Sequence, residues 1–459
     1  MEHSKQLSEA KISSLLIKFS IPAIIGMLVN ALYNVVDRIF VGNSISGDLG
    51  IAGITICFPV MLATFAFMVL IGMGANSLVS IRLGQNKKEE AEHILGNAVF
   101  LLILTSLSIT VLGLVFLDPL LQALGVTKEI LPYAKEFMHI ILLGTIFHAI
   151  SFGLNVFIRG EGNPRMAMYT MLLGAFLNVV FCTIFIFGFG MGVGGSALAT
   201  VLAQACSAAW VLSYFFSKKS SLKIRVANIV PNKAIITKIV ALGSAPFLMQ
   251  LAASLVSIIF NKSLIQYGGN IAITGMGIVT SLQALMLMPV IGINQGSQPI
   301  IGFNYGAKKY DRVQEAFKLA IFGATTLSVI GFIIVEVFTV PIVLLFNKTN
   351  PELIEFTVYA LRVFFIMLPI IGFQIVGANY FTAVGKPKQS AFLSLSRQLI
   401  FLIPAVLILP LFFGIHGIIM AGPVADFLAS IVTAIWIYKE LKHLGHKHDA
   451  HMASQVKTI

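Results

Sequence analysis

Long apolar stretches separated by short polar loops dominate this sequence from end to end. Each stretch is long enough to cross the hydrocarbon core of a bilayer as a helix, which takes about 20 residues. Strands of a membrane barrel would instead appear as short segments of alternating polarity. The pattern predicts twelve transmembrane helices, at residues 15–41, 50–80, 94–117, 131–156, 166–188, 193–216, 237–264, 272–303, 317–343, 353–381, 389–411 and 415–438. We therefore expect an all-α polytopic membrane protein.

Several short motifs occur twice along the chain. Ser20-Ile-Pro22 returns as Ser244-Ala-Pro246, and Gly162-Asn-Pro164 returns as Gly385-Lys-Pro387. The pairs are separated by 222 to 226 residues, and so constant an offset indicates a duplication. Each half holds six predicted spans, so both halves enter and leave the membrane on the same side. The expected architecture is two pseudo-symmetric six-helix bundles related as a parallel repeat.

The repeat also predicts the domain organisation. We expect an N-terminal six-helix bundle at residues 1–216, a cytoplasmic linker at 217–236, a C-terminal six-helix bundle at 237–438 and a cytoplasmic tail at 439–459. Basic residues are concentrated in the N-terminal tail and in the loops that follow even-numbered spans. Because lysine and arginine accumulate in cytoplasmic loops, both termini are expected in the cytoplasm, with the protein in the bacterial cytoplasmic (inner) membrane.

Composition narrows the class of protein further. Hydrophobic residues make up 57% of the chain and charged residues 11%, with a mean hydropathy of +0.92, whereas a soluble domain has about 25% charged residues. The net charge of +12 does not indicate a nucleic-acid-binding protein, because the basic residues lie in short loops between spans. Cys57, Cys182 and Cys206 all fall within apolar stretches, so neither a disulfide framework nor a metal site is predicted. No cofactor is expected.

Two similar bundles in one membrane suggest a secondary transporter, in which a cleft between the bundles opens to each side in turn. The sequence has no nucleotide-binding Gly-x-x-x-x-Gly-Lys-Ser/Thr loop, so an ion gradient is the expected source of energy unless transport is passive. It also lacks His-Glu-x-x-His and Gly-x-Ser-x-Gly motifs, which disfavours the alternative of an intramembrane enzyme.

The first span carries the most informative polar residues. Pro22 removes a backbone hydrogen bond and gives the helix a place to bend. Tyr33, Asn34 and Asp37 lie at spacings that put them near one face of the helix. A carboxylate is costly beside lipid, so this face should meet protein or a water-filled cavity. Our hypothesis makes Asp37 the ion-coupling group and Pro22 the hinge; the alternative is a hydrated interfacial Asp37 paired with Arg38.

Three motifs resemble those of the multidrug and toxic compound extrusion (MATE) family, in its bacterial DinF-like and MepA-like branch. They are Tyr33-Asn-Val-Val-Asp-Arg-Ile-Phe-Val-Gly42, Ile158-Arg-Gly-Glu-Gly-Asn-Pro164 and Gly292-Ile-Asn-Gln-Gly-Ser-Gln-Pro-Ile-Ile-Gly-Phe-Asn-Tyr-Gly306. The resemblance extends over essentially the whole chain. It implies antiport, in which protons or sodium enter as an organic compound leaves. It also implies an ion-coupling cluster of Asp37, Asn178 and Thr200 in the N-terminal bundle.

The chain departs from the family pattern at one position of this cluster. The family has a second acid where this sequence has Cys182. Sodium prefers oxygen ligands, and a thiol is a poor substitute. A lone buried carboxylate, by contrast, can bind a proton reversibly near neutral pH. The sequence therefore favours a proton as the coupling ion, although sodium stays possible.

The second half offers further candidates. Asp426 lies inside the last span, where it is predicted to be a second ion-coupling group, with Arg397 as its partner; the alternative is a purely structural hydrogen-bond partner. Methionine adapts its shape and glutamine bonds without charge, as a binding cavity for varied compounds requires. The predicted substrate-binding residues are Tyr33, Asn34, Gln283, Met286 and Gln298, with ordinary packing as the alternative for each.

The sequence thus predicts a monomeric antiporter that exports organic, mostly cationic drugs or toxic compounds by alternating access in the bilayer. The closest alternative is a related flippase that moves a lipid-linked saccharide. No nucleic acid is expected as a partner.

Overall fold

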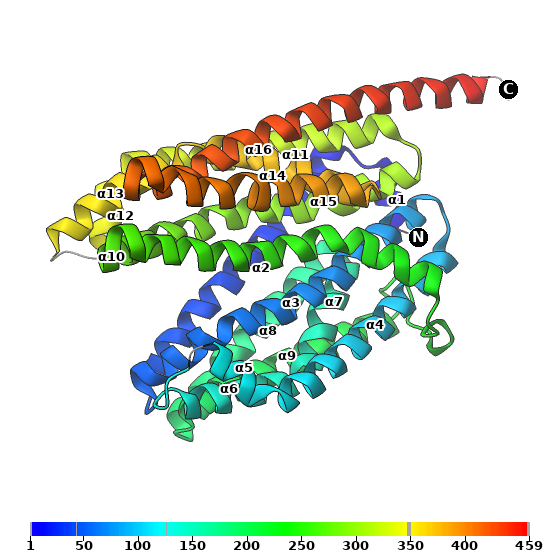
Figure 1. The fold of residues 1–459 in the computed structure, drawn as a ribbon. Helices are drawn as coiled ribbons and strands as arrows, with labels where there is room; N and C mark the ends of the chain where they lie inside the picture. The colour runs from blue at the N-terminus through cyan, green and yellow to red at the C-terminus, as the bar shows by residue number, and fades with distance from the viewer. Residues whose placement is uncertain (1, 43, 125, 347–349, 457–459) are drawn as a thin grey trace. The chain divides into compact units, whose positions relative to one another are not determined.

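The computed structural model describes residues 2–42, 44–124, 126–346 and 350–456, apart from the side chains of 2–5, 30, 33–35, 38–39, 42, 47–48, 270, 443 and 445–456. Within these ranges the regular structure is helical, as the hydropathy pattern predicted (Figure 1). The long helices are α2 (Ile12–Gly42), α3 (Gly47–Gly84), α4 (Lys88–Val115), α7 (Thr145–Gly160), α8 (Pro164–Cys182), α9 (Gly192–Phe216), α10 (Lys233–Gly306), α11 (Tyr310–Val337), α13 (Pro351–Phe365), α14 (Leu368–Ala383) and α16 (Ile403–Val456). The shorter ones are α1 (Glu2–Glu9), α5 (Leu117–Ala123), α6 (Leu131–Leu143), α12 (Thr339–Phe346), α15 (Pro387–Leu395), the π-helices η1 (Thr183–Gly188) and η3 (Ser396–Leu402), and the 3₁₀ turn η2 (Val226–Asn228).

Membrane spans are abundant among these helices. In the described part of the chain, nine helical segments are long and apolar enough to cross a bilayer, and two bent pairs, α6 with α7 and α13 with α14, qualify together. One of the nine covers Pro387–Lys442 and has non-helical backbone at Gly414, with φ 57° and ψ −135°. Dividing it there, between the predicted spans 389–411 and 415–438, gives the twelve spans that the sequence predicts. Gly269 similarly separates the two spans within α10.

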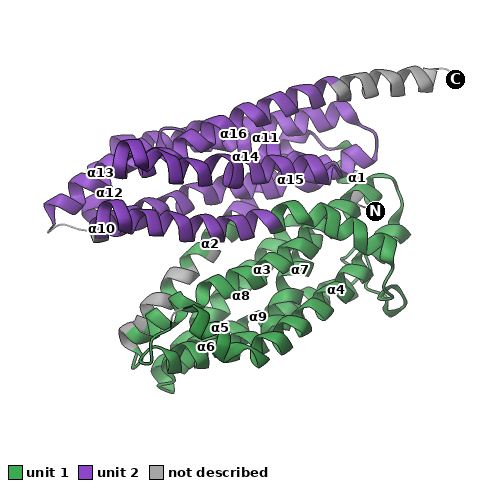
Figure 2. Cartoon of the chain, viewed as in Figure 1, with its two compact units in different colours: residues 1–9, 25–247 green, residues 10–24, 248–459 purple. Residues whose placement is uncertain are grey.

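The chain forms two compact units, drawn in green and purple in Figure 2. Unit 1 contains residues 1–9 and 25–247, and unit 2 contains residues 10–24 and 248–459. Two long helices therefore each contribute to both units. The division falls after Ile24 in α2 and after Phe247 in α10, at positions one repeat apart. The predicted bundles, 1–216 and 237–438, follow the sequence repeat, whereas the compact units exchange the first part of each leading helix.

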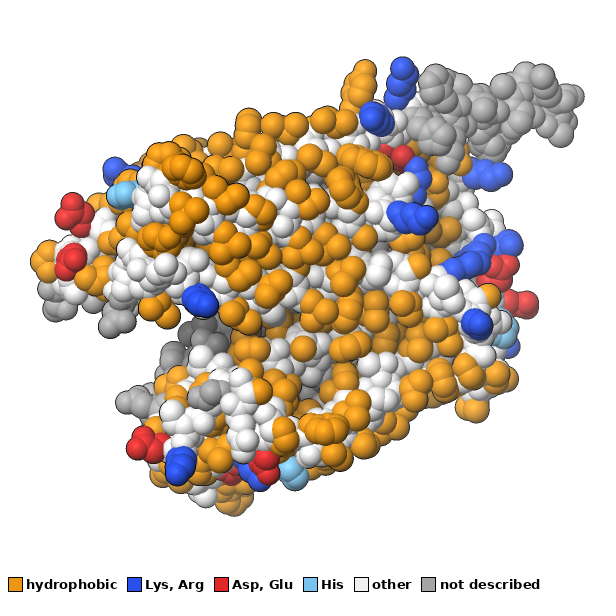
Figure 3. Space-filling view, viewed as in Figure 1, with side chains coloured by type: hydrophobic (Ala, Val, Ile, Leu, Met, Phe, Trp, Pro, Cys, Tyr) orange, Lys and Arg blue, Asp and Glu red, His pale blue; other side chains and the backbone are white. Residues whose placement is uncertain are grey.

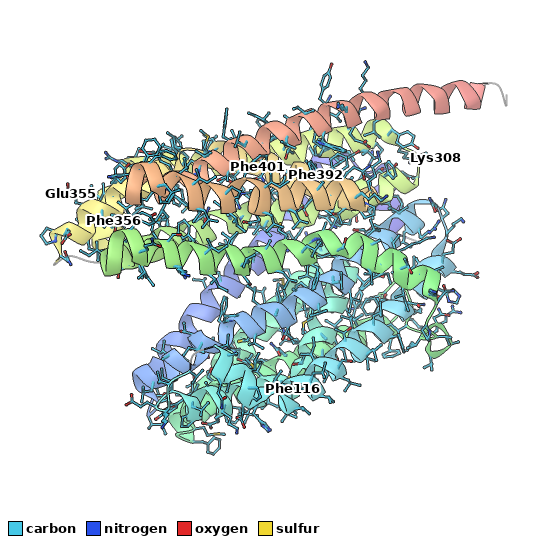
Figure 4. The ribbon with its side chains drawn as sticks, viewed as in Figure 1. Phe116, Lys308, Glu355, Phe356, Phe392 and Phe401 are labelled. Atoms are coloured by element: carbon cyan, nitrogen blue, oxygen red, sulfur yellow. The ribbon has the colours of Figure 1, made fainter. Side chains whose placement is uncertain are left out.

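Each unit has an apolar core and charged ends. The core of unit 1 includes Val41, Leu142 and Val193, and that of unit 2 includes Leu264, Val335 and Ile418. On the face of unit 2 that Figure 3 shows, hydrophobic side chains cover the middle and charged ones gather toward the ends. Lys308 lies at one of these ends and Glu355 at the other (Figure 4). This distribution is the one expected of a protein whose middle faces lipid.

Small residues hold the exchanged segments. In unit 1, a Cβ atom at Gly243 of α10 would overlap the carbonyl oxygen of Leu70 in α3. In unit 2, a Cβ atom at Gly296 of α10 would lie 2.8 Å from the Ser20 backbone of α2. Glycine thus lets the helix backbones approach closely, as small residues commonly do between membrane helices. The first part of α2 is packed onto α10 in unit 2, and the first part of α10 onto α3 in unit 1.

We expect Gly243→Ala to destabilise the protein, because its methyl group has no room against the Leu70 carbonyl. Overpacking of this kind costs about 1–3 kcal/mol. Gly277→Ala is a matched control in the same helix, since nothing lies within 4 Å of the added methyl, and alanine favours a helix by about 1 kcal/mol over glycine. Thermal unfolding of the purified variants should show a lower Tm for the first only; equal values would contradict the close helix contact.

The segment between the halves is anchored to unit 1 by a buried carboxylate. Glu161, just after α7, accepts hydrogen bonds from the Tyr214 hydroxyl, from Ser220 Oγ at 2.9 Å and from the backbone N–H groups of Ser221 and Leu222 at 3.0 Å. Burial raises the pKa of the Glu161 carboxyl, and these hydrogen bonds oppose part of that rise. The predicted linker is therefore fixed to the end of the first bundle.

Candidate functional site

Asp37 lies in the part of α2 that belongs to unit 1, and its carboxylate is held by two donors. Ser196 Oγ donates a hydrogen bond to Asp37 Oδ1 at 2.7 Å, and Cys182 Sγ donates to the same oxygen at 3.3 Å. Ser196, in α9, and Cys182, the last residue of α8, are both buried. The carboxylate thus reaches into the protein between two neighbouring helices, as its cost beside lipid requires.

The network continues from Cys182 along α8. Asn178 Nδ2 donates to Thr200 Oγ1 at 3.0 Å, and the Cys182 thiol also lies 3.8 Å from Asn178 Oδ1. The structure therefore brings together Asp37, Asn178 and Thr200, the three residues that the family resemblance assigned to one cluster. Their predicted role in ion coupling is a separate matter and stays a prediction.

Local structure explains why these side chains converge. Asn178 and Cys182 are four residues apart on α8, and Ser196 and Thr200 are four residues apart on α9, so each pair shares one helix face. Directly after Cys182 the chain changes to the π-helix η1, at Thr183–Gly188. Such widened turns occur preferentially at functional sites. The apolar core of unit 1 surrounds the cluster and includes Cys182 itself.

Sequence reasoning missed Ser196, which makes the shorter of the two hydrogen bonds to Asp37. The available signal was its position four residues before Thr200 in a span that has few polar residues. A serine in an apolar span is usually satisfied by bonding to its own backbone. It therefore did not stand out as a partner for a carboxylate 159 residues away.

The other predicted residues of the first span are only partly visible. Pro22 lies inside α2 in its unit 2 portion, just before the division between Ile24 and Ile25. Tyr33 and Asn34 belong to α2, but their side chains lie outside the described part of the chain. The same is true of Arg38, so the alternative pairing of Asp37 with Arg38 stays open.

Unit 2 contains a second buried acid with a charged partner. Asp426 of α16 is 2% exposed, and its Oδ1 lies 2.5 Å from Nε of Arg397 in the π-helix η3. This pairing of Asp426 with Arg397 confirms the partner that the sequence suggested. One repeat earlier, position 397 corresponds to Gly174, which lies close to Ser207. The ion pair therefore has no counterpart at those positions of the first half.

The predicted substrate-binding residues of α10 lie in unit 2. Gln298 is buried, and Gln283 and Met286 are partly buried. Met286 packs against the core of the unit, and its Sδ lies 3.1 Å from where a Cβ of Gly331 would be. Such packing is the ordinary function of a methionine in a helical bundle. A role of these three residues in substrate binding stays a prediction.

Comparisons with known proteins agree with the duplicated architecture. The sequence model of the MatE family matches residues 22–184 and again residues 246–407, so the two matches begin at Pro22 and Pro246. The multidrug export protein MepA of Staphylococcus haemolyticus (strain JCSC1435) is 26% identical over 430 residues, which are 94% of each chain.

Solved structures show the same fold over nearly the whole chain. The structure of the MATE multidrug transporter DinF-BH in complex with rhodamine 6G is 40% identical, has a TM-score of 0.87 and covers 93% of this chain and 95% of that one. The outward-facing conformation of a multidrug resistance MATE family transporter of the MOP superfamily is 25% identical, with a TM-score of 0.90 and coverage of 96% and 98%.

Proposed function

Since this chain belongs to the MatE family, whose members are membrane transporters rather than enzymes, we propose that it exports organic, mostly cationic compounds in exchange for a coupling cation. The observation that carries this proposal is the full-length similarity to proteins named as multidrug exporters. The similarity includes 40% identity to a transporter whose structure contains a bound dye. That match covers 93% of this chain, so it extends over both repeats.

The surroundings of Asp37 favour a proton as the coupling ion. A hard cation such as sodium is bound best by several oxygen ligands. Here one of the groups against Asp37 Oδ1 is the Cys182 thiol, which donates a hydrogen to the carboxylate. This arrangement suits an acceptor that gains and loses a proton. Protonation of Asp37 would replace an acceptor by a donor at that oxygen, and either Ser196 or Cys182 would then have to turn away.

This exchange of hydrogen bonds offers a route from proton binding to movement. Asp37 stands on the same helix as Pro22, and α2 belongs to unit 2 up to Ile24 and to unit 1 beyond it. A helix that loses one backbone hydrogen bond at a proline can bend there at modest cost. We propose that protonation of Asp37 changes the packing of α2 on α8 and α9, that α2 bends near Pro22, and that alternating access follows.

The residue at position 182 should decide which cation can be used. We expect Cys182→Asp to let a sodium gradient drive efflux, because the variant places a second carboxylate beside Asp37 and supplies the missing oxygen ligands. Cys182→Ser is the matched control, since it keeps a hydrogen-bond donor and adds no charge. Ethidium efflux from proteoliposomes under a sodium gradient alone measures the effect. Equal responses of the two variants would contradict a role for position 182 in cation choice.

Export itself is tested in cells. Expression in a bacterium that lacks its own drug pumps should lower ethidium accumulation and raise resistance to ethidium and rhodamine 6G, with both dyes released chemically unchanged. Vector without insert is the control. Unchanged accumulation at verified membrane expression would contradict drug export and favour the alternative of a lipid-linked saccharide flippase.

A further inference from the structure

Unit 1 has a cavity of about 400 Å³ at its predicted cytoplasmic end, away from Asp37. It lies between the end of α3, the start of α4, the segment after η2 and the start of α10 (Figure 1). Its lining residues are Leu78, Arg82, Glu90, His93, Ile94, Asn97, Ala227, Val230, Pro231, Asn232, Ile235 and Lys238. The segment that joins the two repeats therefore forms one wall of the cavity.

That wall is fixed in place by contacts to α4. The backbone N–H of Asn232 donates to Asn97 Oδ1 at 2.7 Å, and Gly96 is so close to Asn228 that a Cβ there would overlap its carbonyl oxygen. Farther back, the backbone N–H of Lys223 donates to the buried Glu92 at 3.2 Å. Because the linker is held at several points, the cavity is a built feature of the fold.

The charged groups of the cavity leave an excess of positive charge. Glu90 is shared by Arg82, with Nε 3.1 Å from its carboxylate, and by Lys87, with Nζ at 2.7 Å. Lys238 is near enough to act electrostatically on Glu90. It makes no hydrogen bond or ion pair within the described residues. With His93 neutral, the lining still holds two cations against one acid.

The second repeat shows that this charge is not a requirement of the fold. Arg82 and Glu90 correspond, 222 residues later, to Asn304 and Arg312. There Arg312 donates from Nε to Asn304 at 3.0 Å and from a terminal nitrogen to the Ala10 carbonyl at 2.7 Å. The arginine of unit 2 thus bonds directly to the chain that leads into α2. In unit 1 an acid takes its position, and the cavity has Lys238 on its wall instead.

We propose that this cavity binds a phosphate ester, with the headgroup of an anionic phospholipid of the cytoplasmic leaflet as the source. Basic pockets among membrane helices on the cytoplasmic side are suited to such headgroups, and charged donors bind phosphate oxygens strongly. Lys238, Arg82 and His93 supply the charged and polar contacts. The apolar side chains of Val230, Pro231 and Ile235 supply a surface for the glycerol and the first methylenes, which a free phosphate does not need. This inference does not depend on drug export.

The test is the thermal stability of the full-length protein in a nonionic detergent. Dioleoyl phosphatidylglycerol should raise the Tm, and the zwitterionic phosphatidylcholine should not, because ligands that bind only the folded state stabilise it. Lys238→Gln should weaken the apparent affinity for phosphatidylglycerol about tenfold, as expected for one lost charge-assisted contact. Lys233→Gln, an exposed lysine of the same helix that does not line the cavity, is the matched control and should behave as the wild type.

A soluble arm separates the two sources of phosphate ester. If glycerol phosphate gives a Lys238-dependent shift as large as that of the lipid, the site is supported but its ligand is a free ester. If Lys238→Gln does not fold, Lys238→Arg and His93→Gln take its place: the first keeps the charge and should bind, and the second should bind more weakly. The proposal is overturned if phosphatidylcholine is as effective as phosphatidylglycerol, or if the Lys238 and Lys233 variants respond alike.

Discussion

Asp37→Asn is expected to reduce gradient-driven ethidium efflux to the level of protein-free liposomes, without loss of the folded protein. Asparagine keeps the size of the side chain and an oxygen that can accept from Ser196 and Cys182, so the packing between α2, α8 and α9 should survive. It cannot take up a proton at that oxygen, so the proposed coupling step is lost. Asp37→Glu, which remains protonatable, should retain part of the activity.

The matched control for this change is Asp118→Asn. Asp118 is an exposed acid of α5 in the same unit, 2.7 Å from Lys135. Exposed ion pairs contribute about 0–1 kcal/mol, so neither stability nor efflux should change measurably. Size-exclusion profiles and Tm values establish that all variants are folded. Drug resistance at the wild-type level from cells that express Asp37→Asn would remove Asp37 from the coupling mechanism.

The second large effect is expected at Arg397 and Asp426. Removing one partner of a buried ion pair leaves an uncompensated charge and costs about 3–5 kcal/mol, whereas replacing both by apolar residues is often neutral. Arg397→Met and Asp426→Leu should therefore each lower the Tm strongly, and the double variant should recover most of the loss. Similar Tm values for the single and double variants would contradict a desolvated pair.

The double variant also separates the two interpretations of Asp426. If Asp426 takes part in ion coupling, as we propose, the double variant is folded but its efflux under a pH gradient is greatly reduced. Wild-type efflux from a folded double variant would assign the pair a structural role only. Asp118→Asn again serves as the control for loss of an acid outside the pair.

Hydropathy predicted the spans and the duplication because the lipid and the repeat both leave a direct record in the sequence. It did not predict which helices are shared between the units. The division of α2 after Ile24 and of α10 after Phe247 depends on backbone contacts at glycines such as Gly243 and Gly296. A glycine in an apolar span looks the same whether a neighbouring helix touches it or lipid does.

The candidate site was predicted in part. Asp37 and Asp426 stood out because an acid in an apolar span is rare and costly, and Arg397 followed as the cation on the neighbouring span. Ser196 did not stand out, because serine is tolerated in a membrane helix for local reasons. The Glu161 anchor was also missed, since an acid in a loop between spans carries no sign that it will be buried by the linker.

The most direct test of proton coupling through Asp37 is dye efflux from proteoliposomes that contain the purified protein. A pH gradient and a sodium gradient are imposed separately, on the wild type and on Asp37→Asn. The account predicts that the pH gradient alone drives ethidium movement in the wild type, and that Asp37→Asn does not respond to it. Efflux driven by sodium alone, or pH-driven efflux that persists in Asp37→Asn, would contradict it.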